Sequence, residues 1–363
     1  MFNPKVRNID FELTNRCNAS CPLCARSGVY KGELSEEMFN SGVFDVSTEV
    51  HKHVIDSLDH SAVDAIDYSG CYGDPLMHRD ALQIFKQGEG LYQEVQTNAS
   101  LQSQKFWKET AKIKNLRMWF HIDGLKDTNH LYRRFTVWEK IERNAKTFLD
   151  AGGSGSWCFI VWKHNEHQVE EARELATKWG MDEFIVKKTS RGFEDNNTIT
   201  SRDILTKDGL ETFTYEMPTI KEYQVQHFTD DLQELPIDCY SKKRGTFYIN
   251  CQNNLYPCCI TGQQHYKNQF MEKRTIDPIY GDIDFDFTID PVNNKFQHIV
   301  DQYNELEQWF HMRWKNRHYK HCVKRCGTNL TSNKVHEPIN GGEGSKRMEG
   351  WSGPHSIRNQ WNA

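Results

Sequence analysis

Short runs that favour β-strands alternate with helical segments from the N-terminus to about Thr189, and no other feature constrains the fold as strongly. Six runs rich in Val, Ile, Phe, Tyr or Trp are predicted as strands, at residues 6–13, 63–68, 94–96, 116–122, 157–162 and 183–188. Ser35, followed by two glutamates, has the form of an N-cap. Further helices are predicted at residues 80–87, 103–113, 137–151 and 166–179. Strand then helix, repeated, predicts an α/β fold with a parallel sheet and right-handed crossovers.

The periodicity leaves the order of the strands in the sheet open. Six units fit an open partial (β/α)6 barrel of the TIM type or a doubly wound sheet, and both architectures gather their chemistry at the carboxyl ends of the strands. We expect the regular region to form one domain over residues 1–192. We further expect a polar linker or insertion at 193–238, a second cysteine-bearing domain at 239–330 and a loosely packed tail at 331–363.

Composition narrows the class of protein. The sequence is 37% hydrophobic and 26% charged, as in an ordinary globular protein, and no apolar run reaches the roughly 18 residues of a membrane span. The formal net charge of -5 argues against a general nucleic-acid binder. The N-terminus lacks the layout of a secretory signal, so we expect a cytoplasmic protein. In that compartment the eleven cysteines favour metal or cluster ligation over disulfides.

Three cysteines, Cys17, Cys21 and Cys24, directly follow the first predicted strand. This position places them in a loop at the edge of the sheet where chemistry gathers. A structural zinc site needs four ligands, and the next cysteine, Cys71, lies beyond the second strand. Three thiolates would leave one iron of a [4Fe-4S] cluster open for a substrate or cofactor. Zinc with a distant fourth ligand stays an alternative.

The run "CNASCPLC" resembles the C-x3-C-x2-C signature of the radical S-adenosylmethionine (SAM) superfamily, with Leu23 in place of the usual aromatic residue. The resemblance implies a partial barrel with a [4Fe-4S] cluster on Cys17, Cys21 and Cys24, which are then both the metal ligands and the catalytic residues. Its open iron would chelate the amino and carboxylate groups of SAM. Reduction would release methionine and a 5'-deoxyadenosyl radical that abstracts a hydrogen atom from a substrate.

The ends of the second and third strands carry further resemblance. In "YSGCYGDPLMH", Gly73, Asp74 and Pro75 resemble the Gly-Gly-Glu-Pro motif whose backbone binds the SAM amino group, although Gly-Asp-Pro also suits a plain turn. In "QTNAS", Asn98 matches a residue near the SAM ribose or carboxylate, and Ala99 replaces the usual glycine.

The end of the fourth strand, "FHIDGLKDTNHLYRR", resembles a Ser-x-Asp-Gly segment of the superfamily. His121 replaces the serine and Asp123 is kept. Arg133 or Arg134 would pair with the SAM carboxylate, because a guanidinium matches a carboxylate in bidentate geometry. After the fifth strand, Asn165 is expected to cap the helix that follows it.

A second cysteine group follows residue 238. "GTFYINCQNNLYPC" predicts a hairpin that turns at Asn253-Asn254, and an apolar stripe over residues 299–314 predicts an amphipathic helix. The arrangement resembles a twitch domain, a shortened SPASM domain with one auxiliary [4Fe-4S] cluster. The resemblance assigns as ligands Cys239, Cys258, Cys322 and Cys326, with Cys259 as a rival for Cys258. A structural zinc on four thiolates is the alternative.

Together the motifs predict a radical SAM enzyme that acts on a peptide or a small polar metabolite, with oxidation, dehydrogenation or cross-linking as the outcome. An external electron donor such as a flavodoxin or ferredoxin is implied, and neither a membrane nor a nucleic-acid partner is expected. Two other classes stay open: a non-catalytic iron-sulfur electron carrier and a zinc-binding module.

Overall fold

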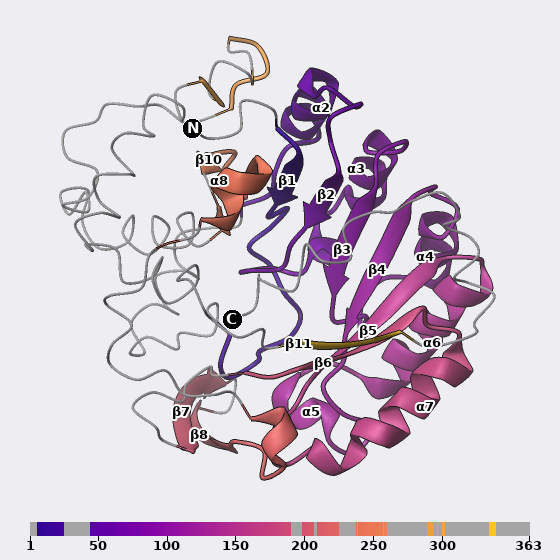
Figure 1. The fold of residues 1–363 in the computed structure, drawn as a ribbon, viewed down its shortest axis with the longest axis vertical. Helices are drawn as coiled ribbons and strands as arrows, with labels where there is room; N and C mark the ends of the chain where they lie inside the picture. The colour runs from indigo at the N-terminus through magenta and orange to yellow at the C-terminus, as the bar shows by residue number, and fades with distance from the viewer. Residues whose placement is uncertain are drawn as a thin grey trace, which may run out of the picture.

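The computed structural model describes residues 6–24, 44–189, 198–206, 209–224, 237, 239–256, 258–259, 289–293, 296, 300–301 and 334–338. Its centre is a nine-stranded sheet in the order β10-β9-β1-β2-β3-β4-β5-β6-β11 (Figure 1). Six parallel strands occupy the predicted positions, namely β1 (Asn8–Phe11), β2 (Ala65–Tyr68), β3 (Gln93–Thr97), β4 (Leu116–His121), β5 (Ser154–Ile160) and β6 (Glu183–Lys187). The α/β fold is confirmed.

Strands β1 to β6 lie side by side in the order in which they occur in the chain. A doubly wound sheet reverses its strand order at a switch point, whereas a barrel adds each strand beside the previous one. The observed order is therefore that of an open partial barrel, and it places the loops after β1, β2, β3 and β4 next to one another at one edge.

The helices cover one face of this sheet (Figure 1). They are α2 (Thr48–Ser57), α3 (Ala81–Gln87), α4 (Gln104–Thr110), α6 (Trp138–Asp150) and α7 (Val169–Trp179). The short α5 (Asn129–Tyr132) packs through Tyr132 beside the cysteine loop instead, and two 3-10 turns are η2 (Pro75–Met77) and η3 (Glu166–Gln168). Four of them lie at predicted positions, while α2 and α5 were not predicted. The helix expected after Ser35 and most of residues 299–314 lie outside the described residues.

The two faces of the sheet differ in chemistry because side chains alternate along each strand. Phe11, Tyr68 and Phe120 belong to the apolar core under the helices. Asp10 and Asp67 lie opposite each other in the register of β1 and β2, on the other face. A functional site is therefore expected on the polar face of the sheet and in the loops at its edge, because the other face is filled by the apolar core.

The predicted hairpin after residue 238 is confirmed. Helix α8 (Tyr240–Arg244) precedes β9 (Thr246–Ile249), which pairs antiparallel with β10 (Leu255–Tyr256). Asn253 adopts a positive φ of 66° in the turn, a conformation that asparagine tolerates. Strand β9 also pairs in parallel with β1, so the hairpin extends the barrel sheet itself.

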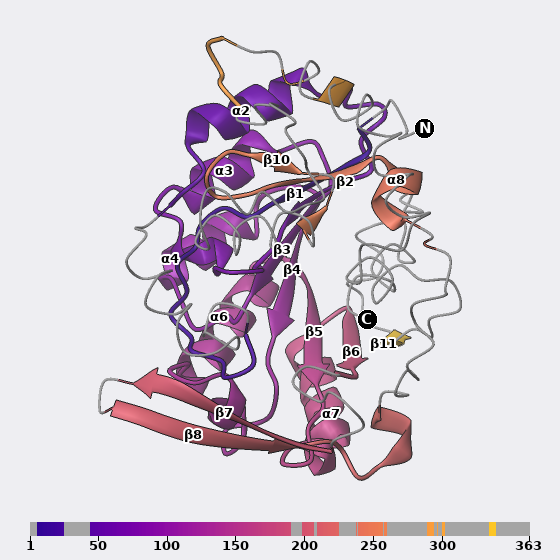
Figure 2. The same ribbon diagram turned by 90° about the vertical axis from the view of Figure 1, so that its left-hand side faces the viewer.

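Three further strands lie at two places in the chain where no strands were predicted. Strands β7 (Ile199–Thr206) and β8 (Gly209–Glu216) form a two-stranded sheet within the expected linker or insertion. A 3-10 turn, η4 (Lys221–Tyr223), follows it. Figures 1 and 2 show this sheet at the β6 end of the barrel, apart from β9 and β10. Within the expected tail, β11 (Lys334–Pro338) pairs antiparallel with β6. In the described part of the chain, no helix has the length and apolar character needed to cross a membrane.

Candidate functional site

The three N-terminal cysteines lie in the loop after β1, as predicted. Cys21 is buried, Cys17 and Cys24 are half-buried, and all three pack in one apolar cluster with Leu23 and Trp162. Hydrogen bonds within the loop fix its conformation: the Cys24 amide donates to the Cys21 carbonyl at 3.0 Å, and the Ala19 amide donates to Cys17 Sγ at 3.4 Å.

The environment of these thiols suits a bound group that replaces their protons. Burial raises the pKa of Cys17 well above its usual value and that of Cys21 to about 11, so both are neutral without a ligand. Among the described residues, no three His, Cys, Asp or Glu side chains converge closely enough to hold a single metal ion. Thiolates of a four-iron cluster each bind a different iron, and three neighbouring thiols in one apolar cluster fit such a group.

The loop after β2 is fastened to the cysteine loop. Gly73 lies so close to the segment after β1 that a Cβ atom would stand 1.9 Å from the Thr14 carbonyl oxygen, and the Asp74 amide donates to the Arg16 carbonyl at 2.8 Å. The Asp74 carboxylate accepts from the Asn98 amide at 2.8 Å, and its burial raises its pKa to about 6. Its side chain braces this loop against the end of β3, and Pro75 begins η2.

Asn98, at the end of β3, faces the same cysteine loop. Its Nδ2 donates to Asn18 Oδ1 at 2.8 Å and lies 3.8 Å from Cys17 Sγ. The neighbouring Ala99 adopts φ 63°, the left-handed conformation that favours glycine. This backbone conformation explains why the superfamily pattern has glycine at this position, and alanine adopts it at a cost in conformational energy.

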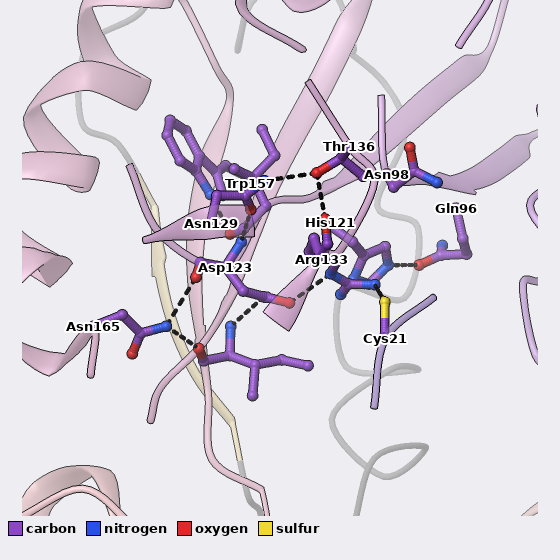
Figure 3. A network of polar contacts seen from close by, with 12 residues as sticks. Cys21, Gln96, Asn98, His121, Asp123, Asn129, Arg133, Thr136, Trp157 and Asn165 are labelled. Atoms are coloured by element: carbon purple, nitrogen blue, oxygen red, sulfur yellow. Dashed lines mark hydrogen bonds and ion pairs between the residues drawn. The ribbon is translucent and has the colours of Figure 1, made fainter. Parts of the chain in front are cut away.

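Figure 3 shows how the end of β4 reaches the cysteines through Arg133. Arg133 Nε donates to Asp123 Oδ2 at 2.6 Å, and its Nη1 donates to Cys21 Sγ at 3.9 Å. Asp123 is fully buried and also accepts from the Ile160 amide at 2.7 Å. Although burial opposes the charge, Asp123 and Cys21 raise the pKa of Arg133 above its usual value. A permanent cation thus stands beside Cys21, and Asp123 acts by holding it there.

The other two candidates from this region face different partners. His121 Nε2 lies 2.6 Å from Gln96 Oε1 (Figure 3). Arg134 pairs with Glu211 of β8 at 3.2 Å, and its guanidinium lies 4.2 Å from the centre of the Phe213 ring. Of the two arginines offered by the sequence, Arg133 is therefore the one whose side chain reaches a cysteine. Arg134 contacts the cysteine loop only through its backbone carbonyl, which accepts from the Ser20 amide at 3.2 Å, and its side chain holds the β7-β8 sheet.

The predicted capping role of Asn165 is wrong. Asn165 does occupy the N-cap position of η3, but its side chain makes no capping bond. Its Nδ2 donates to the Asp123 and Ile160 carbonyls at 2.9 and 3.0 Å, and its Oδ1 accepts from the Trp162 amide. The deep burial of this side chain offers it backbone carbonyls of β4 and β5, and these replace the local cap.

Sequence reasoning missed Glu12 and Tyr248. The Glu12 carboxylate accepts from the Tyr72 and Gly73 amides and from the Tyr248 hydroxyl. Its burial raises its pKa to about 8. An acidic residue at the end of a strand, five positions before Cys17, is the signal that was available.

The second cysteine group meets the barrel through Cys71. Cys239 is the N-cap of α8, and Cys258 and Cys259 follow β10. A hydrogen bond with Cys71, together with burial, raises the pKa of Cys259 well above its usual value. Cys71, in the loop after β2, is thus in contact with the C-terminal group. The remaining predicted ligands, Cys322 and Cys326, lie outside the described residues, so the auxiliary site stays a prediction.

Comparison with protein-family models and with curated protein sequences gives no match to the chain. Solved structures do match. Streptococcus suis SuiB bound to S-adenosylmethionine has a TM-score of 0.50 at 12% identity over 82% of this chain, which spans 66% of the length of SuiB. The anSMEcpe structure with bound AdoMet has a TM-score of 0.46 at 12% identity, covering 90% of this chain and 97% of that one. BtrN in complex with AdoMet and 2-DOIA has a TM-score of 0.35 at 11% identity, covering 73% and 82%. At these identities the likeness to SuiB establishes the fold.

Proposed function

We propose that this protein is a radical SAM enzyme, which binds a [4Fe-4S] cluster on Cys17, Cys21 and Cys24. One observation carries the proposal: the segments that follow β2, β3 and β4 each place a residue against the loop that holds these cysteines, namely Asp74 on Arg16, Asn98 on Cys17 and Arg133, at the end of α5, on Cys21. The bound cluster would supply the electron that cleaves SAM to methionine and a 5'-deoxyadenosyl radical.

The residues around the loop take separate roles in this proposal. The backbone of the Gly73 loop binds the SAM amino group, since this loop is pressed against Thr14 and Arg16 beside the cysteines. Asn98 lies where a second polar contact to SAM is needed. Arg133 offsets the negative charge of thiolate and cluster at Cys21, and the hydrogen bond to that sulfur favours the reduced cluster.

The substrate is proposed as a peptide or a small polar metabolite that loses a hydrogen atom, with oxidation, dehydrogenation or cross-linking to follow. A flavodoxin or ferredoxin would supply the electron. We also propose one auxiliary [4Fe-4S] cluster on Cys239, Cys258, Cys322 and Cys326. The contact of Cys259 with Cys71 supports placing this second group beside the barrel.

Anaerobic reconstitution with iron and sulfide, followed by SAM and a strong reductant, tests the function. We expect about eight irons per chain, the sum of two four-iron clusters, and formation of 5'-deoxyadenosine. Replacing Cys17, Cys21 and Cys24 by Ala should abolish SAM cleavage and leave about half of the iron. Cys158→Ala is the matched control, because Cys158 is buried against Trp119 and Ile185, away from the three thiols. An iron-loaded protein that yields no 5'-deoxyadenosine would be an iron-sulfur electron carrier and not a radical SAM enzyme. A protein that contains only zinc would be neither a radical SAM enzyme nor an electron carrier, but a zinc-binding module.

A further inference from the structure

Glu12 joins two parts of the chain that are 236 positions apart. Its carboxylate accepts from the Tyr72 and Gly73 backbone amides at 2.6 and 3.0 Å through Oε1, and from the Tyr248 hydroxyl at 2.5 Å through Oε2. Glu12 and Tyr248 are each 1% exposed. Water does not compete for these bonds, so each one holds its partners firmly and is costly to lose.

The bonds from Tyr72 and Gly73 fix the direction of two peptide planes in the loop after β2. In a trans peptide, the N–H and the carbonyl of the preceding residue point in opposite directions. Because these two amides point at Glu12, the carbonyls of Cys71 and Tyr72 point away from it. Carbonyl oxygens are the acceptors that an ammonium group requires.

Gly73 of the same loop packs closely against the residues that lead into the cysteine loop. A Cβ atom on Gly73 would stand 1.9 Å from the Thr14 oxygen and 2.8 Å from the Arg16 oxygen. The Asp74 amide is bonded to Arg16 as well. The loop is therefore held between Glu12 and the residues that lead into the cysteine loop, and a shift of the Glu12 side chain moves it.

Tyr248 belongs to the C-terminal hairpin. It lies opposite Asp10 in the register of β9 and β1, and it packs against Tyr256 and Cys259. The position of its hydroxyl is thus set by the docking of β9 on the barrel. Because this hydroxyl donates to Glu12, the docking of the hairpin also fixes the position of the Glu12 carboxylate.

We propose that Glu12 and Tyr248 are positioning residues that hold the carbonyls of the loop after β2 in the direction that binds the amino group of SAM. The C-terminal hairpin would then complete the SAM site of the barrel. The inference rests on the proposed function. It does not depend on the charge of Glu12, because Oε1 accepts from the two amides in either protonation state and Oε2 either accepts from Tyr248 or donates to it.

Tyr248→Phe tests the inference, since it removes the hydroxyl and keeps the ring. Tyr256→Phe is the matched control, because Tyr256 is a buried tyrosine of the same hairpin that packs against Tyr248. Two quantities are measured: the Kd of SAM for the reconstituted protein without reductant, and hydrogen–deuterium exchange of the Tyr72 and Gly73 amides without SAM. Tyr248→Phe should weaken SAM binding about tenfold and speed exchange at both amides, with the cleavage rate at saturating SAM nearly unchanged.

Glu12→Gln adds a second variant, because its amide keeps an acceptor for the two backbone N–H groups and a donor for Tyr248, so it should bind SAM nearly as well as wild type. An unchanged SAM affinity in Tyr248→Phe, or an equal loss in Tyr256→Phe, would overturn the inference while the proposed function stands. If wild-type protein binds no SAM, the proposed function fails and this inference fails with it.

Discussion

The two cysteine groups of this chain are held in different ways. The N-terminal loop is contacted by the segments that follow three neighbouring strands of one parallel sheet, which supply Asp74, Asn98 and Arg133. The described part of the second group is attached through one strand, β9, and through the contact of Cys259 with Cys71. The first group is therefore part of the barrel, whereas the second is an extension of its edge. A group bound by the first three cysteines would therefore depend on the barrel loops, whereas one bound by the second group would depend on the docking of the hairpin.

The largest expected effect is a loss of bound iron, which should distinguish Cys258 from Cys259 as the ligand of the proposed auxiliary cluster. We expect Cys258→Ala to lose about four of about eight irons and Cys259→Ala to keep them, because Cys259 is already engaged by Cys71. Iron and sulfide analysis of the reconstituted variants measures this. Equal losses from both variants would mean that Cys71 and Cys259 take part in the second site.

Asp123→Asn should be the most destabilising change at the first group. It leaves Arg133 with an uncompensated charge in a buried place, a change that typically costs about 3–5 kcal/mol. Glu211→Gln breaks the other arginine pair, but Glu211 is 44% exposed, so it should cost less than about 1 kcal/mol. Urea unfolding of the two apoproteins gives both values. Similar losses would show that the burial of Asp123 does not make its pair with Arg133 stronger than the exposed pair of Glu211 with Arg134.

Two buried groups, Glu12 beside the site and His51 in the core under the helices, should make the stability of the protein depend on pH in opposite directions. Burial raises the pKa of Glu12 to about 8, with Asp10 and Tyr248 beside it, so the folded state holds a proton that the unfolded state has lost. Stability should fall as pH rises from about 4.5 to about 8. Burial lowers the pKa of His51 to about 4, so stability should also fall as pH drops from about 6.5 to about 4.

Two variants test which group causes the loss of stability toward high pH (the alkaline limb) and which causes the loss toward low pH (the acid limb). Glu12→Gln should flatten the fall toward pH 8 and leave the acid limb as it is, while His51→Gln should flatten only the acid limb. Thermal unfolding of the apoproteins across pH 4 to 9 records both. An alkaline limb that persists in Glu12→Gln would assign it to another group.

The smallest effect concerns the turn after β3. Ala99→Gly should stabilise the protein by up to about 1 kcal/mol, because glycine relieves the positive φ of 63°. Ala145→Gly in the middle of α6 should destabilise it by about 1 kcal/mol or more. Opposite signs in chemical denaturation support the strained turn, and a loss in both variants would refute it.

Much of the barrel was predictable, because β-rich runs and helical segments alternate locally and chain order sets strand order. The cysteine loop was found for the same reason: its three residues lie within one short run. What escaped prediction depends on residues distant in sequence. Glu12 and Tyr248 meet only because β9 pairs with β1, and Asn165 gave up its cap because strand carbonyls lie within its reach. The β7-β8 sheet was missed because its strands are largely polar, so they lack the apolar alternation of a half-buried strand.

The electron paramagnetic resonance spectrum of the reduced, reconstituted protein, recorded with and without SAM, shows whether the proposed cluster on Cys17, Cys21 and Cys24 has an iron open to SAM while the proposed cluster at the second group is closed. We predict that SAM changes the signal of one cluster only, and that the change persists in Cys258→Ala, where the second cluster is lost. A spectrum that SAM leaves unaltered, in a protein that carries both clusters, would contradict the account.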